Sequence, residues 1–401
     1  MTSPTQVLRN VRPMGAAAAD LLIADGRIRA VLPAGTADAS LPLLADGAGQ
    51  LLLPALVEAH VHLDKTLWNM PWRPNTAGPT RWHRITNEQT VLRDEIQVPM
   101  AERTGALIEH CIAQGSLHIR SHVDAQTAWG MAHVEAMLDI RRQYADVVDL
   151  QLVTFPQGGM LCSPGAVALM EQSLALGMDV VGGIDPAVID GDPIRALETL
   201  FGMATRFGKP LDIHLHDLGE LGRWEIERIC DFTQSHGMQG RVTISHAYAL
   251  GAFAPADLEP LADRLAALGI TILTCVPMHF TVPPVALLRS RGVNVAAGSD
   301  GIRDAWGPTG NGDMLERAMF LGLRYGWSKD AQLADALDIV THGGARALAL
   351  ADYGLAPGCQ ADLLLLPSEN IAEAVINRDR RRTVIRRGRL VARDGVFLAP
   401  R

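Results

Sequence analysis

Side chains able to bind a metal ion or to move a proton close several apolar segments of this sequence. The pattern His-X-His ends two of these segments, and a further histidine and an aspartate end two more. Residues two apart on a β-strand point to the same side, and two neighbouring imidazoles pack poorly in a core but bind metals well. The pattern therefore indicates a metal site built from strand ends. The residues are His60, His62, His214, His216, His246 and Asp300.

Such a ligand set indicates the metal and the chemistry. Three imidazoles and a carboxylate suit one Zn2+ or Fe2+ ion and leave an open position for water. The ion lowers the pKa of bound water, so that metal-bound hydroxide attacks near neutral pH while a general base moves the proton. A second metal usually needs a bridging ligand. Gln157 and Asp185 occur on the third and fourth predicted strands, with no lysine to form a carbamate bridge, so we expect one divalent ion.

Each of these residues also has a structural interpretation. A single buried histidine is usually a hydrogen-bonded core residue. Asp300 by itself is suited to cap a following helix. The recurrence of such residues at the same end of several strands favours the metal site.

The elements that carry these residues predict an α/β fold. Apolar, strand-like segments alternate with spacers of roughly 20–50 residues, enough for a crossover helix and its loops. Eight such units predict a (β/α)8 TIM barrel, whose strand ends converge on one mouth. A doubly wound sheet is the alternative, but no glycine-rich phosphate fingerprint follows the first strand. The segments are 51–63, 116–124, 148–157, 178–186, 211–217, 241–250, 271–278 and 293–301.

The two ends of the chain differ from the middle. Both carry short β-like pieces separated by Asp-Gly and Arg-Gly turns, which are typical of hairpins. We predict that residues 1–55 and 355–401 combine into a small β-sandwich beside a catalytic barrel of residues 56–354. The alternative is that each end adds its strands independently.

Composition restricts the partners and the location of the protein. A net charge of -8 argues against nucleic-acid and membrane-surface binding. Five dispersed cysteines without a CxxC pair form no disulfide framework. The first residues lack the apolar core of a signal peptide, and no apolar run reaches membrane-spanning length. We expect a cytoplasmic homo-oligomer that acts on a small molecule.

Several motifs resemble the amidohydrolase superfamily, on its cytosine-deaminase branch. They are HVHLDK (60–65), FPQGG (155–159), HLHD (214–217), SHAYA (245–249) and SDGIRDAW (299–306). Within the branch, further stretches resemble the N-isopropylammelide isopropylaminohydrolases of s-triazine breakdown. These are GGIDPA (182–187), DIHLHDLG (212–219) and IRDAWGPTGNGDM (302–314). The resemblance extends over nearly the whole chain and implies a barrel enzyme that hydrolyses C–N bonds.

The resemblance assigns a role to each motif position. His246 matches the histidine that polarises the substrate and shuttles protons, Gln157 matches the glutamine that binds a ring carbonyl and ring nitrogen, and Trp306 matches an aromatic at the pocket rim. The implied metal ligands are His60, His62, His214 and Asp300. The implied catalytic residues are His246, Asp300, Asp217 and His216, and the implied substrate contacts are Gln157, Lys65, Asp185 and Trp306.

Two departures from the cytosine deaminases argue against cytosine as the substrate. Asp217 stands where those enzymes have a glutamate, and Gly301 stands where they have a second aspartate. Lys65, together with His216 and Asp185, follows the ammelide-type pattern, and we expect it to hydrogen-bond a ring carbonyl or an anionic ring. A solvated salt bridge to a neighbouring acid such as Asp64 is the alternative for this lysine.

Residues around these motifs give weaker predictions. His122 and Asp124 end the second predicted strand and are expected to support the site. Arg303 and Asp304 are expected to pair or to brace the mouth. A long loop at 66–90 carries tryptophans that line a lid or pack on the surface, and the basic run 378–382 is expected to be a solvated turn. The tryptophans are Trp68, Trp72 and Trp82.

The sequence thus predicts a mononuclear hydrolytic deaminase. It would release ammonia or an alkylamine from a pyrimidine or s-triazine ring by attack of metal-bound hydroxide. The alternatives are a cytosine deaminase proper, a hydrolase of cyclic amides and a metal-binding protein without catalysis. The missing bridging lysine counts against the cyclic-amide hydrolase, and the proton shuttle at His246 counts against the last.

Overall fold

Eight parallel strands form the centre of the molecule. A computed structural model describes residues 4–398. Each predicted segment contains one of these strands, and each strand pairs with the next along the chain. The prediction of a (β/α)8 barrel is therefore confirmed. The strands are β5 (Leu56–Val61), β6 (Ser116–Asp124), β7 (Asp149–Phe155), β8 (Val180–Ile184), β9 (Leu211–Leu215), β10 (Val242–His246), β11 (Thr271–Thr274) and β12 (Val295–Ala297).

The barrel closes between its last and first strands. The backbone N–H of Asp300 donates to the carbonyl of His60 at 2.9 Å, and Val61 forms a parallel bridge with Asp300. A Cβ on Gly298 would lie 2.5 Å from the His60 carbonyl oxygen, so only glycine permits this approach. Closure excludes the doubly wound sheet and brings two predicted ligands onto adjoining strand ends.

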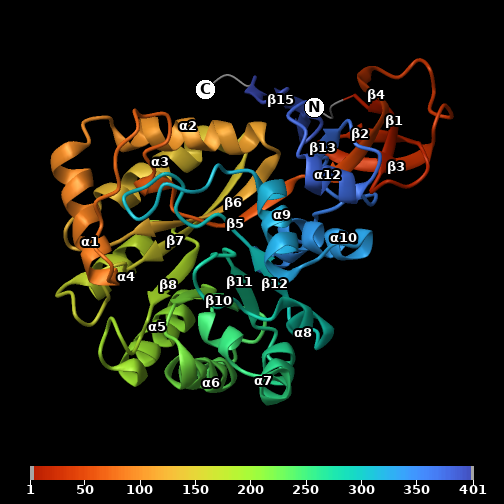
Figure 1. The fold of residues 1–401 in the computed structure, drawn as a ribbon. Helices are drawn as coiled ribbons and strands as arrows, with labels where there is room; N and C mark the ends of the chain where they lie inside the picture. The colour runs from red at the N-terminus through yellow and green to blue at the C-terminus, as the bar shows by residue number, and fades with distance from the viewer. Residues whose placement is uncertain (1–3, 399–401) are drawn as a thin grey trace.

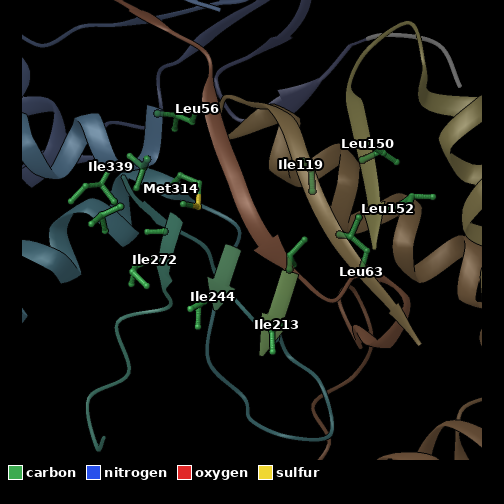
Figure 2. Close-up of a cluster of buried hydrophobic side chains, with 14 of the residues drawn as sticks. Leu56, Leu63, Ile119, Leu150, Leu152, Ile213, Ile244, Ile272, Met314 and Ile339 are labelled. Atoms are coloured by element: carbon green, nitrogen blue, oxygen red, sulfur yellow. The ribbon is translucent and has the colours of Figure 1, made fainter. Parts of the chain in front are cut away.

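Helices surround the barrel (Figure 1). Apolar side chains such as Ile213, Ile244 and Ile272 fill the layer between strands and helices (Figure 2). None of the described helices is long and apolar enough to span a membrane. The helices are α2 (Met100–Ala113), α3 (Ala132–Tyr144), α4 (Ala166–Ala175), α5 (Pro193–Phe207), α6 (Gly219–Ser235), α7 (Pro255–Ala267), α8 (Val285–Ser290), α9 (Met314–Tyr325), α10 (Asp330–Asp338) and α11 (Gly344–Ala347).

The segment after β5 is more ordered than expected. Residues 81–90 of the predicted loop form helix α1 (Arg81–Thr90), and a single π-helical turn follows at Val91–Glu95. Thr80 caps the helix, because its side chain accepts from the backbone N–H of His83. The prediction of a continuous loop at 66–90 is wrong for residues 81–90, which form the helix.

Both ends of the chain share one eight-stranded sheet. The N-terminal strand β4 pairs directly with the C-terminal strand β13, which excludes independent additions. Leu363 and Leu365 of β13 face the core of this terminal sheet, whereas Leu364 and Leu366 join the barrel core. Residues 1–3 and 399–401 of the predicted β-sandwich lie outside the described residues. The strands are β1 (Gln6–Pro13), β2 (Ala19–Ala24), β3 (Arg27–Pro33), β4 (Leu43–Pro54), β13 (Leu363–Leu366), β14 (Thr383–Arg386), β15 (Arg389–Arg393) and β16 (Val396–Phe397), and α12 (Ile371–Asn377) follows β13.

Buried ion pairs join the terminal sheet to the barrel. Arg386 on β14 pairs with Asp362 and lies 2.5 Å from Asp149 at the start of β7. Arg382 is buried and bonds both oxygens of Asp313, at 2.7 and 2.9 Å. The prediction of a solvated turn at 378–382 is therefore wrong for Arg382, whose ion pair with Asp313 joins the terminal sheet to the barrel.

Candidate active site

Four predicted ligands converge at the mouth of the barrel. Nε2 of His62 lies 3.2 Å from Oδ1 of Asp300 and 3.4 Å from Nε2 of His214, and Nε2 of His60 lies 3.7 Å from the same Asp300 oxygen. Ligand atoms around one tetrahedral ion with bonds of ~2.0–2.2 Å lie ~3.3–3.6 Å apart. The separations therefore fit a single metal ion held by these four residues.

The charge state of the cluster also fits a metal ion. Nε2 of His60 is buried and has no hydrogen-bond partner among the described residues. Burial, together with the neighbouring histidines, holds the pKa of His214 well below its usual range. Burial alone would raise the pKa of Asp300, but the neighbouring His60 and His62 outweigh it and bring the pKa well below normal. Neutral imidazoles beside a carboxylate are the donor set that a divalent cation requires.

A network behind His60 orients its ring. Nδ1 of His60 lies 3.1 Å from Oγ of Ser245, which donates to Asp212 at 2.6 Å. The Ser245 hydroxyl therefore accepts from His60, which leaves the Nε2 lone pair for the site. Arg120 neutralises the buried Asp212 at 2.9 Å. His122, predicted to support the site, lies 4.1 Å from His60 between ring centres.

His246 reaches the site through an unusual backbone conformation. By strict alternation its side chain would share the face of Ile244, which packs against the helices. The φ angle of +72° at His246 breaks the alternation. Its ring stacks on that of His216, with centres 4.4 Å apart, and Nε2 has no hydrogen-bond partner among the described residues. Burial lowers the pKa of His246 well below its usual value, so the ring is neutral.

Three acids and an arginine form the wall beside His216. Asp185 accepts from the backbone N–H of His216 at 2.6 Å and lies 2.9 Å from its Nδ1. Arg81 of α1 bonds Asp185 and, at 2.9 Å, Asp217. Burial and the charge of Asp217 raise the pKa of the nearby Glu225 to about 8. Asp185 thus orients His216, and Arg81 compensates the two aspartates.

Lys65 is buried, not solvated. Its Nζ lies 3.4 Å from Oε1 of Glu88 and 3.8 Å from Oδ2 of Asp124, and it makes no hydrogen bond within the described chain. The alternative of a solvated salt bridge to Asp64 is wrong, because Asp64 bonds the Asp124 backbone and His133 instead. A buried ammonium with unused donors is suited to a polar ligand.

An apolar wall stands next to this lysine. The rings of Phe155 and Trp306 pack with Ile85 of α1, Ile184 and Ile189. Nε2 of Gln157, at the end of β7, donates to Glu88 at 2.9 Å. The predicted substrate contacts Gln157, Lys65 and Trp306 therefore gather beneath α1, between an apolar wall and a small set of polar groups.

Asp304 occupies the space left by the missing side chain of Gly301. A Cβ added to Gly301 would lie 2.0 Å from Oδ2 of Asp304. The other oxygen, Oδ1, accepts from the backbone N–H groups of Trp306 and Gly307 at 2.8 and 3.0 Å. Burial raises the pKa of Asp304 to about 6. Asp304 does not pair with Arg303, which instead donates to the Met70 carbonyl at 3.0 Å.

The predicted tryptophans lie outside the cluster of predicted metal ligands. Trp68 packs on the core, with its ring 4.5 Å from that of His110, and Trp72 is exposed. Trp82 is also exposed and lines an open cavity of about 390 Å³ between α1 and the segments 126–128 and 158–163. Helix α1 itself covers the mouth, and its inward face carries no tryptophan.

Sequence reasoning missed several residues of the site. Asp212 stands two residues before His214, and period-two alternation was a signal for it. Arg81 and Glu88 gave no comparable signal, because they belong to a segment whose position over the mouth depends on tertiary packing.

Comparisons with known proteins agree with this geometry. A family model described as "Amidohydrolase family" matches residues 90–392. The crystal structure of N-isopropylammelide isopropylaminohydrolase from Burkholderia multivorans superposes with a TM-score of 0.94 at 42% identity, over 98% of this chain and 100% of that one. N-isopropylammelide isopropyl amidohydrolase from Pseudomonas sp. strain ADP is 32% identical over 88% of this chain and 89% of its own. The chain belongs to the amidohydrolase family.

A second solved structure broadens the comparison. That of 5-methylcytosine deaminase from Klebsiella pneumoniae, liganded with 5-fluorocytosine, has a TM-score of 0.85 and 31% identity, over 100% of this chain and 99% of that one. As an amidohydrolase, this protein is an enzyme that hydrolyses C–N bonds other than peptide bonds. Its site combines neutral histidines with a buried carboxylate, the groups that such a reaction needs.

Proposed function

We propose that this amidohydrolase removes an amine from an oxo-substituted s-triazine-type ring, using a single Zn2+ or Fe2+ ion. The observation that carries the proposal is the buried Lys65, which makes no hydrogen bond among the described residues and lies beside Glu88, the partner of Gln157. A dioxo ring presents carbonyl oxygens and readily becomes anionic, which suits a buried cation. Similarity to the isopropylaminohydrolases supports an N-alkylamine as the leaving group.

The metal would be held by His60, His62, His214 and Asp300. When bound, a divalent ion supplies Lewis-acid chemistry that activates water as a nucleophile. The network of Ser245 behind His60 keeps one ligand in the required tautomer.

His246 would carry the proton. Its neutral ring and unpartnered Nε2 allow it to accept a proton beside the cluster and to deliver it to the departing nitrogen. Asp185 holds His216 against the His246 ring, so that the two rings stay stacked during transfer. Asp217, paired with Arg81, is then a supporting carboxylate.

Ring recognition would fall to Gln157, Lys65 and the apolar wall. The amide oxygen of Gln157 suits a ring N–H, and the ammonium of Lys65 suits the neighbouring ring carbonyl. Phe155 and Trp306 exclude water from the ring. These contacts together favour the lactam form of a dioxo heterocycle.

A second candidate is the deamination of an aminopyrimidine such as cytosine. It is favoured by the similarity to 5-methylcytosine deaminase and by the carboxylate of Asp304, which fills the space next to Gly301. The shorter Asp217, engaged by Arg81, argues against it, because protonation of the cytosine ring nitrogen needs a free acid.

One measurement separates these candidates. Ammonia and alkylamine release is followed for a panel containing cytosine, N-isopropylammelide and a cyclic amide, with the metal-loaded enzyme. We expect kcat/KM for the N-alkylated dioxo ring to exceed that for cytosine by roughly tenfold or more. A tenfold preference for cytosine would instead assign the enzyme to the cytosine deaminases, and ring opening alone would assign it to cyclic-amide hydrolysis. The cytoplasmic location and the homo-oligomeric state stay predictions.

A further inference from the structure

Helix α1 turns three residues toward the barrel mouth: an arginine, an isoleucine and a buried glutamate. Arg81, Ile85 and Glu88 are spaced i, i+4 and i+7 and therefore lie on one side of the helix. Arg81 bonds the two wall aspartates, Ile85 joins the apolar wall, and Glu88 reaches the ring-recognition residues. The first two contacts fix the helix, so that Glu88 is held in one position.

Glu88 fixes the direction of the Gln157 amide. Its Oε1 accepts one N–H of Nε2 of Gln157 at 2.9 Å, so the nitrogen end of this amide is turned toward Glu88. The amide oxygen is then the end of Gln157 that can meet a bound ring. If the amide were reversed, two oxygens would face each other, and Gln157 would offer the ring a donor in place of an acceptor.

Lys65 keeps Oε1 of Glu88 an acceptor. Its ammonium lies 3.4 Å from that same oxygen, whereas Oε2 has no partner among the described residues. Burial and the nearby Asp124 and Asp304 raise the pKa of Glu88 to about 8 against the opposing charge of Lys65. A proton taken up by Glu88 goes to Oε2, away from the cation, so Oε1 accepts from Gln157 in both charge states.

We infer that Glu88 is a specificity-determining positioning residue, which makes Gln157 a hydrogen-bond acceptor and so selects rings that present an N–H beside a carbonyl. The inference rests on the proposed function, because it names the ring edge that the same site reads. Glu88 acts through Gln157 and touches no reacting atom.

Binding of an unreactive ring tests this role independently of turnover. The probe is trioxo-s-triazine, which has no amine to lose, and its Kd is measured by titration calorimetry on the metal-loaded protein. We expect Glu88→Leu to raise Kd by about tenfold or more, since Gln157 is then free to reverse. Glu88→Gln should stay within about threefold of wild type, because its side-chain oxygen can accept the same bond. Glu95→Leu, in an exposed ion pair with Arg73 on the same segment, is the matched control and should not change Kd.

A double-mutant cycle with Gln157→Leu completes the test. If Glu88 acts through Gln157, adding Glu88→Leu to that background changes Kd by less than about twofold. Additive effects, or equal losses in the Gln and Leu variants, would overturn the inference and leave Glu88 as a counter-ion of Lys65. Failure of the wild type to bind the ring overturns it as well. Binding with the expected pattern but without alkylamine release refutes the proposed function while Glu88 keeps its assigned role.

Discussion

At the scale of single residues, two histidines of similar burial have different environments. His214 faces the ligand atoms of His62, whereas His246 stacks on His216 beside the cluster. Both are held neutral by burial. This difference in position, and not in charge, supports the proposal that His214 binds the metal ion and His246 transfers the proton.

This assignment predicts the behaviour of His246→Ala. The variant should keep about one equivalent of Zn or Fe per chain, the content that we expect of the wild type, and lose roughly 10²–10⁴-fold in kcat. Metal content by plasma emission spectrometry and amine release measure the two effects. The control is His214→Ala, which should lose the metal. If metal is lost from the first variant and retained by the second, the two roles are reversed.

At the scale of elements, the loop after β12 carries both Asp300 and Asp304. Asp300 and Arg303 have positive φ angles, and the carboxylate of Asp304 closes the turn by accepting from the backbone. Position 301 holds a glycine because the Asp304 side chain occupies the space that a larger residue would need. The loop therefore positions a predicted metal ligand by local contacts that any added side chain would disturb.

Gly301→Ala tests this packing. Its new methyl group would collide with Oδ2 of Asp304 and displace the loop, so we expect a loss of ~1–3 kcal/mol in stability and a clear fall in kcat. Thermal unfolding and amine release give the two values. Gly307→Ala is the control in the same loop, because its nearest neighbouring atom is 4.0 Å away. Equal behaviour of the two variants would show that Asp304 moves aside freely.

At the scale of the whole molecule, a buried charge cluster joins barrel and terminal sheet. His118 on β6 lies 3.1 Å from Asp149 and 3.4 Å from Asp362, and Arg386 pairs with both acids. Burial lowers the pKa of His118, but hydrogen bonds to the two acids outweigh it and raise the pKa overall. The same contacts lower the pKa of Asp362, against the effect of burial. Arg387 also lies 3.2 Å from Asp149.

The cluster predicts how stability depends on pH. The contribution of His118 is complete below its ordinary pKa of about 6.5 and is lost as pH rises through its raised folded-state pKa. The contribution of the acids is present above about pH 4 and is lost as pH falls through their lowered pKa. Between pH 6 and 9 the Tm of the wild type should therefore fall by ~2 °C more than the Tm of His118→Asn. Scanning calorimetry checks this, with His236→Asn as a control at the end of α6. Parallel curves for wild type and His118→Asn would refute the role.

The sequence by itself determined the barrel, the pairing of the two ends and the metal-ligand candidates. Period-two alternation places His60 and His62 on one face, and the C-terminal strand ends of a barrel must converge. These features follow from local spacing, which a linear sequence contains. The roles of the substrate contacts stay predictions.

Tertiary structure alone decided the surroundings of those residues. The helix at 81–90 lies over the mouth because Arg81 and Ile85 meet partners more than 60 residues away along the chain, which no local pattern reveals. The same packing buries Lys65 beside Glu88 and lets Asp304 fill the space at Gly301. Burial and charge at the site depend on contacts between distant segments, and such contacts exist only once the chain has folded.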